Sequence, residues 1–229
     1  MKRILFLLSL LQITLMVSAY DIKVDGIYYN FTSNSTVAVT YNDIDSYHYS
    51  GIGFGLNHPN EEYKGNMVIP ASIEYKNKTY AVTSIGKAAF SVCPLLKSVT
   101  LPTSIVTIEY GAFNNSGLLE SVEIPEGVKE VGAAFSLCAN LKTIVLPSTV
   151  TKVHLLMINS SNKMEELICK ATTPPTFYLD DDDGSTLRKA LKERFFGKCV
   201  LKVPQSSIKA YKSTPGWDMF CDIGSYTPD

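Results

Sequence analysis

Three consecutive segments between Ile85 and Pro147 repeat one pattern of apolar residues, and this repeat constrains the fold more than any other feature of the chain. Each segment has a phenylalanine, a leucine six residues later, and an alternating stretch that ends in proline. Both series recur after 23 and then 22 residues (Phe90, Phe113 and Phe135; Pro102, Pro125 and Pro147). A fixed period of about 20–29 residues with aliphatic residues at set positions is typical of a solenoid of stacked repeats.

The alternating stretch of each segment predicts a short β-strand. Between Leu96 and Pro102, apolar and polar residues alternate with a period of two, which places Val99 and Leu101 inward. Proline cannot donate a hydrogen bond to a sheet, so it ends the strand. A second short strand is expected in each row, at residues 105–108, 128–131 and 150–153. The predicted fold is a repeat solenoid of the leucine-rich-repeat type, mostly short parallel β-strands, in which the Ala-Phe segments form short helical turns.

The complete pattern, Ile/Val-Gly-x-x-Ala-Phe-x-x-Cys-x-x-Leu-x-x-Val-x-Ile/Leu-Pro, resembles the BspA-like leucine-rich-repeat family of bacterial surface and secreted proteins. The first row carries it as Ile85, Gly86, Phe90, Cys93, Leu96, Val99, Leu101 and Pro102. Three later residues depart from it: Glu109 and His154 replace the glycine, and Ser116 replaces the cysteine. The resemblance covers roughly residues 65 to 225, and it implies adhesion or host-protein binding for some members.

The start of the chain predicts export. A basic start at Lys2 and Arg3, an apolar run from Ile4 to Val17 and the small residue Ala19 are typical of a secretory signal peptide, residues 1–19. The run of about 14 apolar residues is shorter than the ~20 that a spanning helix needs, and no later segment is predicted to span a membrane. We therefore expect an extracellular or cell-surface protein, with the periplasm as an alternative.

Charge argues against a nucleic-acid partner. Cleavage after residue 19 removes two of the 21 basic residues, so 19 basic residues face 22 acidic ones and the formal charge becomes −3. A nucleic-acid-binding protein would instead present a basic face.

The regions outside the repeat are predicted to cap it. Residues 20–66 are expected to form a β-rich N-terminal cap, in which two strands flank an Asp-Gly turn at Asp25. Residues 67–171 hold the repeats, about four of them. Fifteen residues separate Pro70 from Ile85 where later rows use six, which predicts a protruding β-hairpin near residues 71–80.

Residues 172–229 are expected to form an α/β C-terminal capping region. Its predicted elements are a helix at residues 185–196, a strand from Val200 to Pro204 and a short helix from Ser207 to Lys212. The acidic run from Asp180 to Asp183 does not fit a calcium-binding EF-hand loop, because Leu179 and Ala190 occupy ligand positions. The run is predicted to be a solvated loop, with weak surface calcium binding as the open alternative.

The five cysteines do not predict a catalytic or metal site. Cys93 and Cys138 lie two rows apart, at about 9–10 Å, which is too far for a disulfide, so both are predicted to be buried. Whether Cys169, Cys199 or Cys221 forms a disulfide stays open. The chain has no zinc, phosphate-loop or serine-hydrolase motif. We therefore predict no metal, no cofactor and no enzyme activity, and a hydrolase is the least favoured hypothesis.

The predicted interaction face consists of the outward residues on the first predicted strand of each row. These residues are Ser98, Thr100, Ser121, Glu123, Thr143, Val145, Glu166 and Ile168. Val145 and Ile168 are apolar residues on an outward side, which a binding patch would use; alternatively, the face is simply solvated. The prediction is a monomeric, exported, adhesin-like protein that binds a protein or glycan. The alternative is a structural or accessory subunit of a bacterial surface assembly, which packs through the cap or the hairpin.

Overall fold

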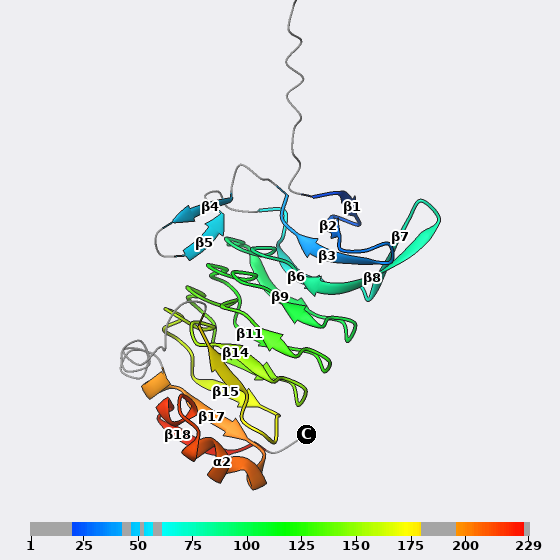
Figure 1. Ribbon diagram of the computed structural model, residues 1–229. Helices are drawn as coiled ribbons and strands as arrows, with labels where there is room; N and C mark the ends of the chain where they lie inside the picture. The colour runs from blue at the N-terminus through cyan, green and yellow to red at the C-terminus, as the bar shows by residue number, and fades with distance from the viewer. Residues whose placement is uncertain (1–19, 43–46, 51–52, 57–60, 180–195, 227–229) are drawn as a thin grey trace, which may run out of the picture.

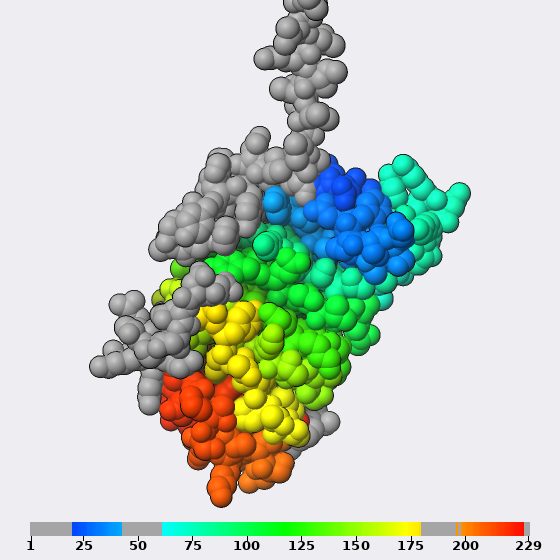
Figure 2. Space-filling model, viewed as in Figure 1, coloured from blue at the N-terminus to red at the C-terminus, as the bar shows by residue number. Residues whose placement is uncertain are grey.

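The computed structural model describes residues 20–42, 47–50, 53–56, 61–179 and 196–226. Within these ranges the chain forms a stack of rows, built mostly of short strands (Figure 1). The space-filling view shows these rows as successive bands from the N-terminal to the C-terminal end (Figure 2). The predicted signal peptide, the Asp180–Asp183 run and the predicted helix up to residue 195 lie outside the described residues.

A five-stranded sheet forms one side of the stack. Its strands are all parallel and follow the order β11-β13-β15-β17-β18. Its inward side chains, such as Val122, Ile144 and Leu167, are buried as the alternating pattern predicts. The strands are β11 (Ser121–Glu123), β13 (Thr143–Leu146), β15 (Glu166–Cys169), β17 (Val200–Val203) and β18 (Asp222–Ser225).

A nine-stranded sheet contains the second strand of each row. Its order is β1-β2-β3-β8-β10-β12-β14-β16, with β7 paired to β8, and its strands are parallel from β3 onward except for β7. The strands are β1 (Ile22–Val24), β2 (Ile27–Phe31), β3 (Thr36–Thr40), β7 (Ser72–Tyr75), β8 (Lys78–Ile85), β10 (Thr107–Ile108), β12 (Glu130–Val131), β14 (Lys152–His154) and β16 (Thr176–Tyr178).

Two strand pairs complete the β-structure. β6 (Gly65–Val68) pairs in parallel with β9 (Leu96–Thr100), and β4 (Tyr47–Ser50) pairs antiparallel with β5 (Gly53–Leu56). β7 and β8 form a hairpin that projects from the stack (Figure 1). Its two turn residues, Lys76 and Asn77, have φ angles of 50° and 60°. These values match a type I′ turn, whose twist suits a two-residue hairpin.

The second strands are shorter than predicted because the chain first makes a turn. The strands expected from Ile105 and Val128 begin two residues later, at Thr107 and Glu130. Before each strand, the amide of Ile105 or Val128 donates to the carbonyl of the proline three residues earlier, at 3.1 and 3.4 Å. These amides are therefore used within the row and not in the sheet.

The Ala-Phe segments consist of turns, which corrects the prediction of short helical turns. In the first row, only alternate amides bond within the segment: Ala89 N donates to Gly86 O at 3.2 Å. The amide of Phe90 instead donates to Ala112 O of the next row, at 2.7 Å. An α-helix needs successive amides to bond four residues back, whereas here every second amide is committed to the adjacent row.

A column of stacked aromatic rings runs through the core. The ring centroids of Phe90 and Phe113 are 5.1 Å apart with 6° between the ring planes, and those of Phe113 and Phe135 are 5.1 Å apart with 5° between the planes. All three rings are fully buried. The Phe113 ring therefore buries apolar surface against the rows on both sides, so the rows are stable only together.

A second buried column, of serine and cysteine side chains, donates hydrogen bonds to the backbone carbonyls of the three phenylalanines. Ser116 Oγ donates to Phe90 O at 2.6 Å, Cys138 Sγ donates to Phe113 O at 3.1 Å, and Ser161 Oγ donates to Phe135 O at 2.6 Å. Serine and cysteine thus serve the same purpose here. Each supplies a small donor for the preceding row's buried carbonyl, which would be costly to leave unpaired. Serine can therefore replace cysteine at this position.

The C-terminal residues close one end of the core with short helices. The indole N–H of the buried Trp217 donates to Pro175 O at 2.7 Å, and the hydroxyl of Tyr211 donates to Ala171 O at 2.9 Å. The helical elements are η1 (Phe196–Lys198), η2 (Gln205–Ser207), α2 (Ile208–Ser213) and η3 (Trp217–Met219). The predicted short helix corresponds to α2.

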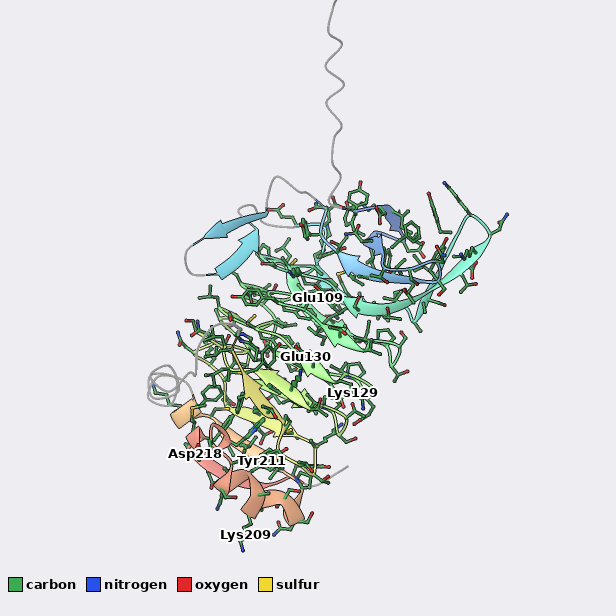
Figure 3. All side chains as sticks on the ribbon, in the orientation of Figure 1. Glu109, Lys129, Glu130, Lys209, Tyr211 and Asp218 are labelled. Atoms are coloured by element: carbon green, nitrogen blue, oxygen red, sulfur yellow. The ribbon has the colours of Figure 1, made fainter. Side chains whose placement is uncertain are left out.

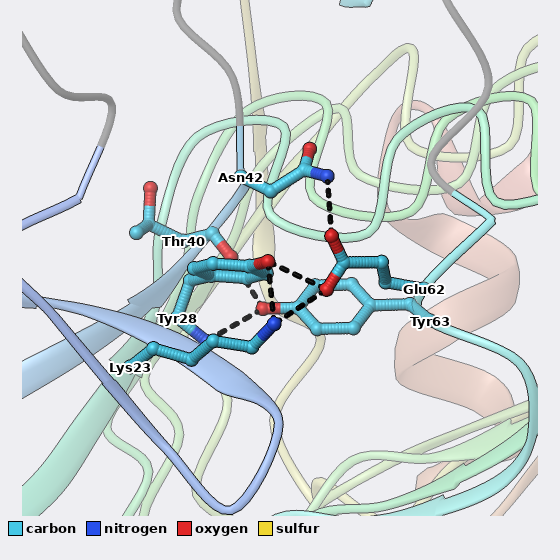
Figure 4. A network of polar contacts seen from close by, with 6 residues as sticks. All are labelled: Lys23, Tyr28, Thr40, Asn42, Glu62 and Tyr63. Atoms are coloured by element: carbon cyan, nitrogen blue, oxygen red, sulfur yellow. Dashed lines mark hydrogen bonds and ion pairs between the residues drawn. The ribbon is translucent and has the colours of Figure 1, made fainter.

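Tyr63 closes the other end of the aromatic column. Its ring centroid lies 4.9 Å from that of Phe90. Its hydroxyl donates to Thr40 O at 2.8 Å and accepts a hydrogen bond from Tyr28 N at 2.9 Å (Figure 4). These two bonds join the N-terminal strands β2 and β3 to the first row.

Glu62, next to Tyr63, is the common acceptor of a hydrogen-bond network at the N-terminal end (Figure 4). Its carboxylate accepts hydrogen bonds from the ammonium of Lys23 at 2.6 Å, from the hydroxyl of Tyr28 at 2.5 Å and from the amide of Asn42 at 3.3 Å. The hydrogen bond from Lys23, followed by the one from Tyr28, lowers the pKa of the Glu62 carboxyl below its ordinary value.

We predict that Phe113→Ala lowers the free energy of unfolding by about 3–5 kcal/mol, because it opens a cavity between two rows that cannot collapse independently. Urea unfolding followed by circular dichroism measures this change. Val106→Ala is the control: Val106 is 49% exposed, and we expect a change within about 0.5 kcal/mol. A loss below about 1 kcal/mol for Phe113→Ala would contradict a shared aromatic column.

The lowered pKa of Glu62 predicts a stability that depends on pH. The ionised carboxylate is favoured by folding, so its contribution is fully present above pH 4.5, the ordinary pKa, and is lost as pH falls through the folded pKa. The side chain is 47% exposed, so the contribution stays below about 1 kcal/mol. Urea unfolding should show Glu62→Gln less stable than wild type at pH 7, by a deficit that becomes smaller at pH 3. Glu61→Gln, at the adjacent exposed residue, is the control. An equal deficit at both pH values argues against the ionised network.

Candidate functional site

The register of the parallel strands brings six of the predicted interaction residues into two lines. Ser121, Thr143 and Glu166 lie side by side on β11, β13 and β15. The second line on the same strands is Glu123, Val145 and Ile168. Ser121 and Glu123 are exposed, and the other four are half-buried. We call the outward side of β9, β11, β13 and β15 the strand face.

Ser98 and Thr100 lie on β9, and there the strand face is not one continuous ladder. β9 pairs with β6, and the pairs Asn66↔Ser98 and Val68↔Thr100 are in register. β11 begins the five-stranded sheet, so β9 and β11 are not hydrogen-bonded neighbours in the described structure. The even spacing of the repeat gave no signal of this break.

A groove with a volume of about 390 Å³ lies at the break between β9 and β11. Its walls carry hydroxyl, carboxylate and ammonium groups together with aliphatic surface. The polar side chains that line it are Thr100, Thr103, Glu123, Glu126 and Lys170. Two of the predicted interaction residues, Thr100 and Glu123, therefore line one concave surface.

Lysines that the sequence interpretation missed form ion pairs on this face. The ammonium of Lys170 lies 2.9 Å from a carboxylate oxygen of Glu123, two rows away, and that of Lys202 lies 3.2 Å from Glu166. The hydrogen bond to Glu123 is the largest cause that raises the pKa of Lys170 above its ordinary value. Lys170 stands where the earlier rows have their strand-final proline, and this substitution was the available signal.

Residues 70–174 match the sequence profile of the BspA type leucine rich repeat region, in 6 copies. This part of the chain is a BspA-type leucine-rich-repeat region. The number of copies exceeds the approximately four rows read from the sequence. No curated protein matches the chain in sequence.

Solved structures with a similar fold are bacterial leucine-rich-repeat proteins. A leucine-rich repeat protein from Bacteroides capillosus is 25% identical, covers 66% of this chain and 98% of its own length, and has a TM-score of 0.53. One from Bacteroides ovatus is 18% identical, covers 90% of this chain with a TM-score of 0.48, and is itself covered over 61% of its length. A leucine rich cell surface protein from Faecalibacterium prausnitzii is 14% identical, with coverages of 89% and 50% and a TM-score of 0.41. This chain thus spans less than two thirds of the latter two proteins.

Four of the five cysteines of the chain are buried thiols. All five cysteines of the chain are free, and only Cys221 is exposed. Burial raises the pKa of Cys138 and of Cys199 to about 12. A thiol must ionise to act as a nucleophile or metal ligand, so neither group reacts readily at neutral pH. The open question of a disulfide among Cys169, Cys199 and Cys221 is answered here by free thiols.

The strand face carries polar side chains and surface ion pairs. Leucine-rich repeats are generally non-catalytic interaction modules. Among the residues that the structure describes, no three His, Cys, Asp or Glu side chains are placed to hold a metal ion. Within the same ranges, no helix has the length and apolar character needed to cross a bilayer.

Proposed function

We propose that the protein is an exported, non-catalytic interaction protein that binds a protein or glycan outside the cell through its strand face. The observation that carries this proposal is the groove at the break between β9 and β11, beside two in-register lines of short polar and aliphatic side chains. A rigid sheet presents such side chains at fixed spacing, which lowers the entropy lost on binding.

The composition of the face supports a polar, reversible contact. Glu123, with a 68% exposed side chain, and the half-buried Glu166 provide charge beside the apolar Val145 and Ile168. The ion pairs that hold these carboxylates are at the surface and contribute about 0–1 kcal/mol each. A ligand therefore has little to overcome in displacing Lys170 from Glu123. The family match supports an interaction role, and the adhesin-like role at the cell surface is part of this proposal.

The alternative is a structural or accessory subunit of a surface assembly. The β7–β8 hairpin favours it, because it projects from the stack (Figure 1). Its exposed polar tip offers a contact surface separate from the strand face.

Charge reversal on the strand face tests the proposal. Biosensor tips coated with basement-membrane matrix would be dipped into increasing concentrations of residues 20–229, with binding measured by biolayer interferometry. We expect saturable binding that Glu123→Lys with Glu166→Lys weakens at least about tenfold, since charged rim contacts control specificity and association rate. The matched control, Glu61→Lys with Glu74→Lys, makes the same change in net charge elsewhere on the surface and should bind as wild type.

Three results would count against the strand face. Absence of saturable binding to the matrix removes this ligand class, and equal loss in both double variants indicates a non-specific charge effect. Loss in the control alone, which alters Glu74 on the hairpin, favours the structural alternative. Thermal unfolding of both variants confirms that the fold survives.

A further inference from the structure

At one position of the repeat, next to the strands of the nine-stranded sheet, glycine is replaced by a larger residue in some rows. The strand register aligns Gly86, Glu109, Gly132, His154 and Tyr178 in successive rows. The repeat pattern has glycine at this position, and the chain keeps it only in the first and third of these rows. The side chains of Glu109 and His154 therefore flank Gly132 from both sides.

Gly132 lies between these two side chains, and its own backbone packs closely against the preceding row. A Cβ atom built on it would lie 3.0 Å from Tyr110 N and 3.1 Å from Glu109 C, so the backbones of the two rows meet too closely for a side chain here. The cavity above it has a volume of about 280 Å³. Its lining includes Glu109, Glu130, Tyr110, His154 and Tyr178. Figure 3 labels Glu109 and Glu130 on successive rows in the middle of the stack.

The His154 ring lies nearly perpendicular to both tyrosine rings that line this cavity. Its ring lies 6.1 Å from Tyr110 with 86° between the ring planes, and 5.0 Å from Tyr178 with 84° between the planes. The amide of Leu156 donates to His154 Nδ1 at 3.1 Å, so the neutral imidazole carries its hydrogen on Nε2. His154 is 3% exposed, and its ring packs against both tyrosine rings.

We propose that the cavity over Gly132 binds one uncharged pyranose unit of a glycan, at a site separate from the strand face. The carboxylates of Glu109 and Glu130 accept hydrogen bonds from sugar hydroxyls, and bonds to charged acceptors are stronger than neutral ones. The faces and edges of Tyr110 and Tyr178 pack against the apolar C–H side of the ring, since tyrosine combines a large apolar body with a polar tip. Concave sites of this kind, apolar walls with a few convergent polar groups, are typical of small-molecule binding.

Charge and size select this ligand over other classes. Two carboxylates and one lysine, Lys87, line the cavity, so an anionic sugar or a phosphate would be repelled. The volume holds a single ring rather than a peptide segment. The nearest competitor is a lysine or arginine side chain of a protein partner, which two carboxylates would also attract, and the test includes it as an outcome.

Saturation-transfer NMR on residues 20–229 tests the proposal with the methyl glycosides of glucose, galactose, mannose and N-acetylglucosamine. We expect at least one to bind saturably. Glu109→Gln keeps the shape of the side chain but removes its charge, and it should weaken binding by about tenfold. Tyr178→Ala should abolish binding, while Tyr178→Phe, which keeps the ring, should retain most of it. Glu120→Gln on the five-stranded-sheet side is the matched control and should bind as wild type.

Three results would overturn the assignment of this cavity to a pyranose. No saturable binding of any of the four glycosides, or binding that is unchanged in both Glu109→Gln and Tyr178→Ala, rejects the site. Binding of Nα-acetyl-lysine amide, which keeps the charged side-chain ammonium, or of free arginine in place of the glycosides assigns the cavity to a protein side chain. If Tyr178→Ala does not fold, Glu109→Gly, which restores the repeat's own glycine, replaces it. Glu123→Lys with Glu166→Lys should leave glycoside binding intact, which separates this site from the strand face.

Discussion

Burial between adjacent rows is the constraint on which the rest of the structure depends. A row of about 22 residues has only a few large apolar side chains, and burying these cannot offset the entropy of ordering the row alone. Stacking changes this balance, because the phenylalanines of neighbouring rows cover one another and Phe113 is covered from two sides. The hydroxyl and thiol donors beside the column satisfy the carbonyls that stacking buries. The ends, which lack a neighbouring row, need Tyr63 and Trp217 to close them.

This division between core and surface explains how the chain presents its two outer sides. Inward positions are fixed by stacking, so variation is left to the outward positions of the strands. On the five-stranded sheet, the outward side chains form mixed polar and aliphatic lines with ion pairs between rows. On the nine-stranded sheet, the two residues that replace glycine line a cavity together with the glycine that remains. The same rows thus support two surfaces of different chemistry.

Much of the fold follows from the period of the sequence, and the exceptions come from bonds between rows. The inward residues and the aromatic column were predictable, because they recur at fixed offsets. The turns at the Ala-Phe segments were not, because whether Phe90 N bonds back along the chain or across to Ala112 O depends on the neighbouring row. Val92 and Leu137 adopt positive φ angles of 50° and 62°, although neither residue type favours that region. Here the stacked backbone overrides local preference.

The candidate site was predictable to a similar extent. The outward positions on β11, β13 and β15 follow from alternation, and their register follows from the recurrence of the pattern every 22 or 23 residues. The break after β9 and the reach of Lys170 across two rows depend on three-dimensional packing that no periodic pattern encodes. The departures at Glu109 and His154 were visible as substitutions, but only the register shows that they flank one glycine.

Native-state hydrogen exchange measures the central claim, that the rows share one core, most directly. If stacking holds the rows together, the amides of β11, β13 and β15 should exchange with a common free energy of opening, within about 1 kcal/mol, and with the same dependence on denaturant. Three separate opening free energies, each with a small denaturant dependence, would show that the rows unfold independently and would contradict the account.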